Sequence, residues 1–406
     1  MKYPFEKLCI VLILLALFGY LYTQFKPSLL LPMHDYYYDY PGALLQESFD
    51  ERSGGNERSE ENDLDAGQEG LTATSIQSLT AANQGLALSQ YMIKGAYNAA
   101  FDGTSMTDAQ LKTVLENGCR FIDLEVHAMN ISGAVTPVLI TTTDGKSTTG
   151  KPYYLTDALT TLVNTGFASS LSNSKDPLFL HLRIITGSIV NHNDLYCNCA
   201  KIINTKLGSL LYNGNIVTST PMASLMGHVV LCVDKSLIPD YKSYPTCSGC
   251  ESVAASSSPS PSPSASASTS GACPTLKQLV SAETGGFTWT TMNYGSVVGI
   301  PPANCNADDG GVLMPQNNLP VMQLVVPPST LKQKNPSPKD MYRFVSMSTC
   351  QTVLFMYYQT DTGANELSFY ESIFTNSSSA IVPMCYAITY ITNNWNKFRG
   401  NQAANY

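Results

Sequence analysis

Charged side chains alternate with apolar ones in two strand-like stretches of the sequence. The stretch "FIDLEV" carries Asp123 and Glu125, and the stretch "FLHLRI" carries His181 and Arg183. Because alternate residues of a strand face the same side of a sheet, each pair projects in one direction. Two carboxylates beside an imidazole can bind a metal ion or move a proton, whereas two carboxylates beside a guanidinium form a metal-free ion-pair cluster. The alternative is a set of polar residues that are hydrogen-bonded inside the protein only for stability.

The elements that must position these side chains alternate between strand and helix. Helical apolar spacing covers 107–118, 154–167 and 193–211, with Thr107 as one expected N-cap and Thr156 or Asp157 as another. Strand-like runs cover 119–126, 136–142, 176–185, 227–236, 319–327, 350–360 and 378–384. Strands that alternate with helices over short connections predict a parallel sheet, and so many repeats favour a closed barrel over an open sheet.

Length and charge limit the classes of function. The chain has 406 residues, which suits one barrel with tails. The net charge is −8, and the segment 46–70 alone contributes −7, since it holds nine acidic residues and two arginines. The rest of the chain is therefore close to neutral. It has no basic face for a nucleic acid, and no nucleic-acid partner is expected.

The N-terminus predicts a membrane anchor. Residues 8–25 are uncharged, and 18 residues of helix span about 27 Å, close to the thickness of the hydrocarbon core. Lys2 and Lys7 precede this run, which favours a cytoplasmic tail over 1–7 and a single-pass type II protein with its bulk outside the cell, in a lumen or on a virion. A cleaved signal peptide is the alternative. Residues 26–74 are expected to form a disordered acidic stalk.

The eleven cysteines and two sequons fit a lumenal or extracellular chain. Four cysteines in strand-like runs are expected to be buried thiols: Cys119, Cys232, Cys350 and Cys385. Six in loop-like sequence are expected to form up to three disulfides, with pairing left open: Cys197, Cys199, Cys247, Cys250, Cys273 and Cys305. Three of these flank a Ser/Pro-rich insertion, 251–272, where a disulfide across the base would fix its ends. A zinc site at 247–250 ranks below a disulfide. Asn130 and Asn376 lie in glycosylation sequons.

Several short motifs resemble one known family in order and spacing. They are "GAYNA" (95–99), "GCRFIDL" (118–124), "PVLIT" (137–141), "PLFLHLR" (177–183), "GHVVLCVDK" (227–235), "NPSPKDMYRFVSMSTCQTVLFMYYQTD" (335–361) and "FTNSSSAIVPM" (374–384). Together they resemble the catalytic barrel of phosphatidylinositol-specific phospholipase C of the eukaryotic type, over roughly 88–390. The resemblance implies a TIM-type (β/α)8 barrel over 75–390, split by the insertion at 251–272, and a C-terminal tail over 391–406.

The resemblance also implies roles for particular positions. The two catalytic histidines of the family fall on Tyr97 and on Thr141, or on Thr142 or Thr143 with a small shift. The calcium-ligand positions fall on Asn98, Asp123 and Glu125, and a further ligand position falls on Arg183. A phosphate-binding lysine of the family falls near Cys232, with Lys235 close by.

Both proton-transferring groups of the family are thus replaced. Tyrosine is a poor base at neutral pH because its ordinary pKa is about 10. We expect no cofactor, with calcium as the alternative, because Arg183 would neutralise the two carboxylates. The other histidines of the barrel, His127, His192 and His228, are expected to be structural or exposed.

We expect the first of three functions, and the other two are alternatives. The first is a membrane-tethered, catalytically inactive barrel that binds an inositol phospholipid headgroup, a glycan or a protein partner. The second is an active phosphodiesterase with a rearranged site, built from His181, Asp123, Glu125 and a metal ion. The third is a structural protein of an envelope or cell surface. This function agrees with the anchor, the acidic stalk and the Ser/Pro-rich insertion.

Overall fold

The structure is a computed structural model of the full chain. It describes residues 76–143, 146–147, 152–187, 191–244, 246–247, 273–285, 289–294, 322–327, 334–361 and 365–403. The predicted tail, anchor and stalk (1–7, 8–25 and 26–74) lie outside these ranges, as does the Ser/Pro-rich insertion, 251–272. Within the described ranges, no helix is both long enough and apolar enough to cross a bilayer.

Eight parallel strands form a closed barrel. They follow one another around the ring in chain order: β1 (Tyr91–Ala96), β2 (Phe121–Ile131), β7 (Leu178–Ile185), β8 (Val229–Asp234), β9 (Ala282–Thr284), β10 (Trp289–Asn293), β11 (Met322–Val326) and β12 (Thr352–Phe355). The ring closes because β1 pairs with both β2 and β12, with Gly95 opposite Phe121 on one side and Leu354 on the other. The predicted TIM-type barrel is therefore confirmed by the strand pairing itself.

Among the residues that the structure describes, five further strands lie outside this ring. They are β3 (Ala134–Leu139), β4 (Thr142–Thr143), β5 (Lys146–Ser147), β6 (Tyr153–Tyr154) and β13 (Ile381–Pro383). The runs 136–142 and 378–384 were predicted to be strands, and both contain one, β3 and β13. The parallel pairing predicted for the sheet is wrong for these two strands. β3 turns back along β2 as a hairpin arm, and β13 pairs with β1, both antiparallel.

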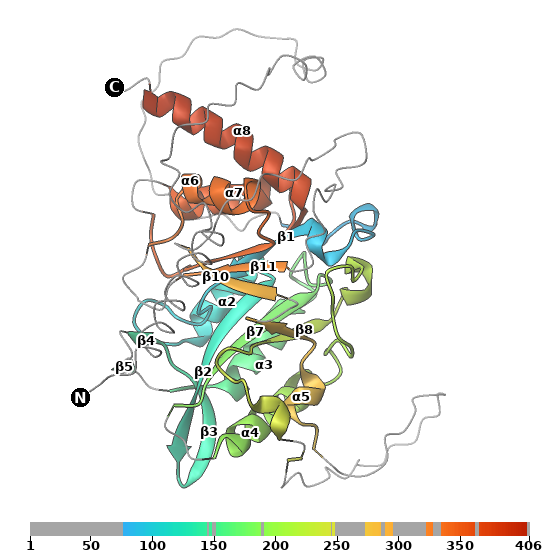
Figure 1. The fold of residues 1–406 in the computed structure, drawn as a ribbon, viewed down its shortest axis with the longest axis vertical. Helices are drawn as coiled ribbons and strands as arrows, with labels where there is room; N and C mark the ends of the chain where they lie inside the picture. Colours follow the sequence, from blue (N-terminus) through green and yellow to red (C-terminus); the bar gives the residue numbers. More distant parts are fainter. Residues whose placement is uncertain are drawn as a thin grey trace, which may run out of the picture. The chain divides into compact units, whose positions relative to one another are not determined.

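The helices cover the outside of the ring (Figure 1). They are α2 (Asp108–Glu116), α3 (Leu155–Gly166), α4 (His192–Leu207), α5 (Leu276–Leu279), α6 (Pro338–Met341), α7 (Glu366–Asn376) and α8 (Met384–Ala403). Single turns lie at η1 (Ala81–Asn83), η2 (Leu88–Gln90), η3 (Met222–Leu225), η4 (Tyr241–Ser243) and η6 (Tyr342–Ser346). The C-terminal tail predicted over 391–406 begins inside α8, and α7 had no counterpart in the sequence prediction.

Local sequence explains where α2 begins and ends. The Thr107 hydroxyl accepts a hydrogen bond from the Gln110 backbone N–H at 3.2 Å, as predicted for this N-cap. Leu111, Val114 and Leu115 recur at helical spacing and are buried, and Gly118 follows the helix with a left-handed φ of 84°. The cap predicted for the next helix is wrong, because α3 begins after Tyr154 without a side-chain cap.

The two faces of each barrel strand pack into different apolar clusters. On β2, Ile122 and Leu124 face outward and pack with residues of the surrounding helices. Phe121 faces inward, where it stacks on Phe179 of β7 and meets Trp289 of β10 edge-on, at ring-centroid distances of 6.1 and 5.4 Å. Because β2 and β10 lie on opposite sides of the ring, these rings fill the barrel interior. They form the floor below Asp123 and Glu125, which continue the inward face of β2.

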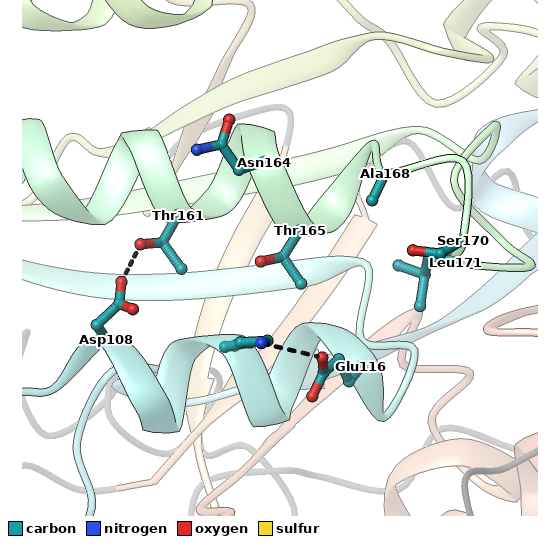
Figure 2. A pocket seen from close by; sticks show the side chains of 9 residues that line it. Asp108, Glu116, Thr161, Asn164, Thr165, Ala168, Ser170 and Leu171 are labelled. Atoms are coloured by element: carbon teal, nitrogen blue, oxygen red, sulfur yellow. Dashed lines mark hydrogen bonds and ion pairs between the residues drawn. The ribbon is translucent and has the colours of Figure 1, made fainter.

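Helices α2 and α3 lie side by side on the outside and leave a polar groove between them (Figure 2). Nine residues line it: Asp108, Lys112, Glu116, Thr161, Asn164, Thr165, Ala168, Ser170 and Leu171. The Thr161 hydroxyl donates to Asp108 across the groove, and Lys112 pairs with Glu116 along one helix at 3.8 Å. The last two side chains are more than half exposed, so this groove is an ordinary solvated helix surface.

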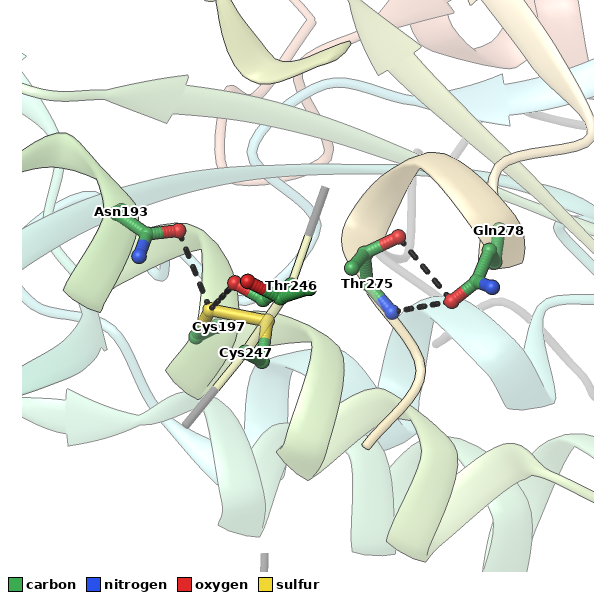
Figure 3. Close-up of a disulfide and its surroundings, with 6 residues drawn as sticks. All are labelled: Asn193, Cys197, Thr246, Cys247, Thr275 and Gln278. Carbon is green, nitrogen blue, oxygen red and sulfur yellow. Dashed lines mark hydrogen bonds between the residues drawn. A yellow bond between two sulfur atoms is a disulfide. The ribbon is translucent and has the colours of Figure 1, made fainter. Parts of the chain in front are cut away.

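A disulfide joins α4 to the segment that leads into the insertion. Cys197 of α4 is bonded to Cys247 (Figure 3). Cys247 also forms an isolated β-bridge with Cys273. The base of the insertion is therefore held by the backbone bridge between Cys247 and Cys273, and the disulfide of Cys247 runs to α4 rather than across that base. Cys273 is disulfide-bonded as well.

Among the other cysteines, the predictions are confirmed for three and wrong for two. Cys119, Cys232 and Cys350 are buried free thiols, as predicted. Cys199 was expected in a loop disulfide but is a buried free thiol on α4, because helical spacing turns it away from Cys197. Cys385 was expected to be a free thiol but is disulfide-bonded.

We expect the double variant C197S/C247S to lose about 2–4 kcal/mol of unfolding free energy, since the disulfide closes a segment with a sequence separation of 50 residues. Urea unfolding of the full chain measures the loss. The variant T246A, next to the disulfide and exposed, serves as the control and should unfold at the wild-type urea concentration. Identical midpoints for the double variant and T246A would show that the disulfide contributes nothing.

Candidate functional site

Polar side chains from three neighbouring strands meet inside the barrel, above the aromatic floor. In the register of β2 and β7, Asp123 lies opposite His181 and Glu125 lies opposite Arg183. Asn98 follows the end of β1, and its backbone N–H donates to Asp123 at 3.0 Å. We call these five residues the mouth cluster. The structure therefore brings together the side chains that the sequence singled out on "FIDLEV", "FLHLRI" and "GAYNA".

Arg183 is at the centre of the mouth cluster. Its Nε donates to the two oxygens of Asp123 at 2.9 and 3.2 Å, and Nη2 also donates to Asp123 at 3.0 Å. Nη1 donates to Glu125 Oε2 at 3.0 Å, and Nη2 donates to the side-chain oxygen of Asn98. The Tyr97 ring lies against the guanidinium, with 4.5 Å between Cζ and the ring centroid. One cation thus contacts every residue at a predicted calcium-ligand position.

His181 has a partner on both ring nitrogens. Its Nδ1 lies 2.8 Å from Asp123 Oδ1, and because an ionised carboxylate only accepts hydrogen bonds, Nδ1 carries the proton. Its Nε2 lies 2.7 Å from the Thr284 hydroxyl on β9, and the imidazole is fully buried. His181 therefore supports Asp123 and has no nitrogen free for a substrate.

His127 also belongs to this site, which the sequence did not predict. The strand predicted over 119–126 ends before His127, but β2 continues through this residue, so its side chain lies on the same face as Glu125. Its Nε2 lies 2.7 Å from Glu125 Oε1, and its side chain is 14% exposed. The pattern Asp-x-Glu-x-His over 123–127 carries this signal, since it places three side chains on one strand face.

Tyr97 and Thr141 occupy the positions where the family resemblance implies histidines. The Thr141 hydroxyl accepts a hydrogen bond from Asn98 Nδ2 at 2.9 Å, and Thr141 is 1% exposed. Asn98 adopts a left-handed backbone conformation with φ of 42°, which turns its side chain between Thr141 and Arg183. Thr142 and Thr143 form the short strand β4. An imidazole is present at neither of the implied histidine positions, and the groups there are a phenol and a hydroxyl.

The electrostatics of the mouth cluster favour ionised carboxylates. Burial alone would raise the pKa of Asp123, but the charge of Arg183 and the hydrogen bond from His181 lower it below its ordinary value overall. The pKa of Glu125 is lowered in the same way against its burial, by the hydrogen bond from His127 and the charge of Arg183. Burial would lower the pKa of Arg183, but the two carboxylates raise it well above its ordinary value. Burial raises the pKa of Tyr97 to about 12, so its phenol is protonated at neutral pH.

The donor set does not fit a calcium ion. Calcium binds six to eight oxygen atoms, but the oxygens of Asp123, Glu125 and Asn98 that face the centre already accept from Arg183. The other Glu125 oxygen is bound to His127. Within the described ranges, no group of three or more His, Cys, Asp or Glu side chains is arranged to hold a metal ion. The positive charge that the carboxylates need is supplied by Arg183.

The remaining predicted residues lie away from the mouth cluster. Lys235 is 40% exposed and pairs with Glu283 at 3.5 Å, so the structure does not bring it to the cluster as a phosphate-binding lysine. Asn130 is exposed next to the turn of the β2–β3 hairpin, and Asn376 is exposed at the end of α7. Glycosylation of these two asparagines stays a prediction.

Comparison with known proteins gives similarity in structure only. No protein-family model and no curated protein matches the sequence. PLC21 from L. pealei is 14% identical over 74% of this chain with a TM-score of 0.47, and the match spans only 37% of that protein. A calcium-dependent phosphoinositol-specific phospholipase C from Pseudomonas sp. is 10% identical over 76% of this chain and 99% of its own, with a TM-score of 0.43.

A glycerophosphodiester phosphodiesterase from Parabacteroides distasonis is also similar, with 10% identity over 71% of this chain and 98% of its own and a TM-score of 0.36. The predicted resemblance to phospholipase C-like barrels is confirmed as a resemblance. The barrel itself is defined by the strand register described above.

We expect D123N to lose about 3–5 kcal/mol of unfolding free energy, because it leaves Arg183 and His181 with a weaker buried partner. Urea unfolding measures the loss. The control is E116Q, which breaks the exposed pair between Lys112 and Glu116 and should change the free energy by less than about 1 kcal/mol. Equal effects of the two variants would mean that the buried pair contributes no more than a surface pair.

Stability should also fall in acid. A carboxyl group whose pKa is lowered by folding stabilises the protein fully above its unfolded pKa of about 4, and this contribution is lost as the pH falls toward the folded pKa. Urea unfolding from pH 6 down to pH 2 should therefore show a steep loss of stability in the wild type. The variant D123N/E125Q should show a shallower loss, and an unchanged slope would contradict the assignment.

Proposed function

We propose that this protein is a phospholipase C-like barrel that does not hydrolyse phosphodiesters and acts as a binding or structural module at a membrane. The observation that carries the proposal is the state of the two positions where the family resemblance implies proton-transferring histidines. Burial raises the pKa of Tyr97 to about 12, so its phenol keeps its proton at neutral pH. Thr141 carries a buried hydroxyl that already accepts a hydrogen bond from Asn98. A group that stays protonated is no general base at neutral pH.

The imidazole of His181 does not replace them. His181 is fully buried, and its two nitrogens are bound to Asp123 and Thr284. Proton transfer to a substrate requires a group within hydrogen-bond reach of the reacting atom. In the absence of both proton carriers, catalysis should fall by many orders of magnitude, by analogy with enzymes whose paired catalytic groups are removed.

The charge of the mouth cluster affects which ligands it can bind. The two carboxylates and one guanidinium carry a fixed net charge of −1 (−2 + 1), and the guanidinium is held by these carboxylates. This arrangement repels a phosphate group more than it attracts one. It favours a neutral ligand or a protein partner over an inositol phospholipid headgroup among the ligands considered from the sequence.

Attachment to a membrane is part of the proposal and is supported by the uncharged run at 8–25. A single-pass anchor followed by an acidic stalk would hold the barrel away from the bilayer. Such an arrangement suits a receptor-like or envelope module.

A second candidate function is supported by one observation. Glu125 holds His127 at 2.7 Å, and His127 is the imidazole of the site whose side chain reaches solvent. A carboxylate that orients an imidazole is the arrangement of a general base. The second candidate is therefore a hydrolase in which His127 takes the proton from the attacking hydroxyl group.

One assay separates the two candidates. The purified full chain is incubated with phosphatidylinositol and with glycerophosphodiesters, in calcium or in EDTA, and released products are quantified. The proposal predicts product formation no higher than with heat-denatured protein. The matched variants are H127A and H228A, since His228 lies in the turn before β8, at the opposite end of the barrel strands, and bonds only to backbone there. Turnover that H228A keeps and H127A loses would overturn the proposal in favour of the hydrolase.

A further inference from the structure

Residues 76–79, which we call the entry segment, join the barrel to the preceding part of the chain. The Gln77 backbone N–H donates to the Ser378 carbonyl oxygen at 2.9 Å. The Ser78 backbone N–H donates to the Ser172 carbonyl oxygen at 3.2 Å. The entry segment therefore lies between the end of α7 on one side and the loop between α3 and β7 on the other.

A buried carboxyl group holds the end of the entry segment. Asp176 lies just before β7, at the end of the barrel strands opposite the mouth cluster. Its Oδ1 accepts a hydrogen bond from the Leu79 backbone N–H at 2.8 Å, and the Ser78 side chain interacts with the same carboxyl group. Asp176 is fully buried, and Leu79 is 4% exposed. The entry segment therefore contacts an ionisable group that is shielded from water.

Arg120 is also fully buried near this carboxyl group, but it is bonded elsewhere. Its Nη1 donates to the Gly166 carbonyl oxygen at 2.9 Å, and Nη2 donates to Asn173 Oδ1 at 2.6 Å. Arg120 Nε and Asp176 Oδ2 are both buried, and neither atom has a hydrogen-bond partner within the described ranges. An ionised Asp176 is thus a buried charge without an ion pair, which is a costly arrangement.

The ionisation of Asp176 is therefore sensitive to pH. Burial raises its pKa to about 6, although the hydrogen bond from Leu79 and the charge of Arg120 act in the opposite direction. The ordinary pKa of this group is about 4. A carboxyl group whose pKa is raised by a folded contact favours that contact in acid, and this contribution is lost as the pH rises through the raised pKa. The sign is opposite to that of Asp123 and Glu125.

Other charged groups near Asp176 come from three places. The entry segment itself has no ionisable side chain, and Lys175 is exposed. Burial lowers the pKa of Arg120 to about 10, so it keeps its charge at neutral pH. The turn 226–228 packs against the same loop through a backbone hydrogen bond to Lys175 at 2.8 Å. His228 of this turn can change its charge near neutral pH, so the experiment includes a His228 variant.

We propose that the entry segment and Asp176 form a proton-operated latch at the base of the barrel. With Asp176 neutral, the entry segment stays docked on the loop before β7. With Asp176 ionised, release of the segment is favoured because it brings the carboxylate into water. The latch sets, through pH, how firmly the barrel holds the chain that precedes it. The proposal does not depend on the ligand of the mouth cluster or on phosphodiester turnover.

Hydrogen–deuterium exchange of the full-length protein at about pH 5 and about pH 7.5 tests the latch. Exchange is followed by mass spectrometry and corrected for the intrinsic effect of pH. A pKa of about 6 in the docked state and about 4 after release predicts that protection of the entry-segment amides falls about tenfold from the lower pH to the higher. The amides of α2 serve as the reference and should change less than about twofold.

Three variants assign the effect to one side chain. D176N is neutral at both pH values, so its entry segment should be equally protected at both and at least about tenfold better protected than the wild type at the higher pH. D157N changes an exposed aspartate in the first turn of α3 and should keep the wild-type pH dependence. H228A should keep it as well.

Several results would contradict the latch. Protection of the wild-type entry segment could stay constant or rise with pH, D176N could retain the pH dependence, or H228A could remove it. A D176N that fails to fold, or that unfolds at a lower urea concentration than D157N at the higher pH, also contradicts the latch, since the buried position favours a neutral side chain. A tenfold change in the wild type that is absent in D176N supports it.

Discussion

The contact between Arg183 and two buried carboxylates is the interaction on which the mouth of this barrel depends. Asp123 and Glu125 sit above a floor of stacked aromatic rings, where water cannot solvate their charges. The guanidinium suits this position because its planar fork can bind both carboxylates and the Asn98 amide together. Lysine would offer a single ammonium group and could not reach all three partners in the same geometry.

The architecture of the barrel and the chemistry of the groups at its mouth point to different functions. The strands close a ring and bring five polar side chains together, which is the arrangement on which a hydrolase could be built. The groups at the two implied histidine positions, however, are a phenol that keeps its proton and a buried hydroxyl bonded to Asn98. A binding or structural role is therefore the function that we propose. His127 is the feature that keeps a hydrolytic role open.

Much of the fold could be predicted from the sequence because parallel strands are buried on both faces and read as apolar runs. β7 and β8 were found in this way. β9 and β10 were missed because β9 has three residues and three of the five residues of β10 are polar: Thr290, Thr291 and Asn293. The runs of β3 and β13 are equally apolar, and periodicity does not distinguish an antiparallel arm from a ring strand.

The site could be predicted from the sequence where the alternation of side chains along one strand was enough to place two residues on the same face. Asp123 with Glu125 and His181 with Arg183 follow from the period of two residues, and the pairing register then brings the two strands together. His127 was missed because the strand was expected to end at 126, five residues before β2 ends at Ile131. Thr284 was missed because nothing local marks a threonine on a three-residue strand as the partner of a histidine 103 residues away.

A crystal structure of the full chain grown in CaCl2 tests the central claim most directly. The account predicts the Arg183 guanidinium between Asp123, Glu125 and Asn98, with the same hydrogen bonds and no ion among them. A coordinated cation bound to Asp123 and Glu125, with Arg183 turned out toward solvent, would contradict it.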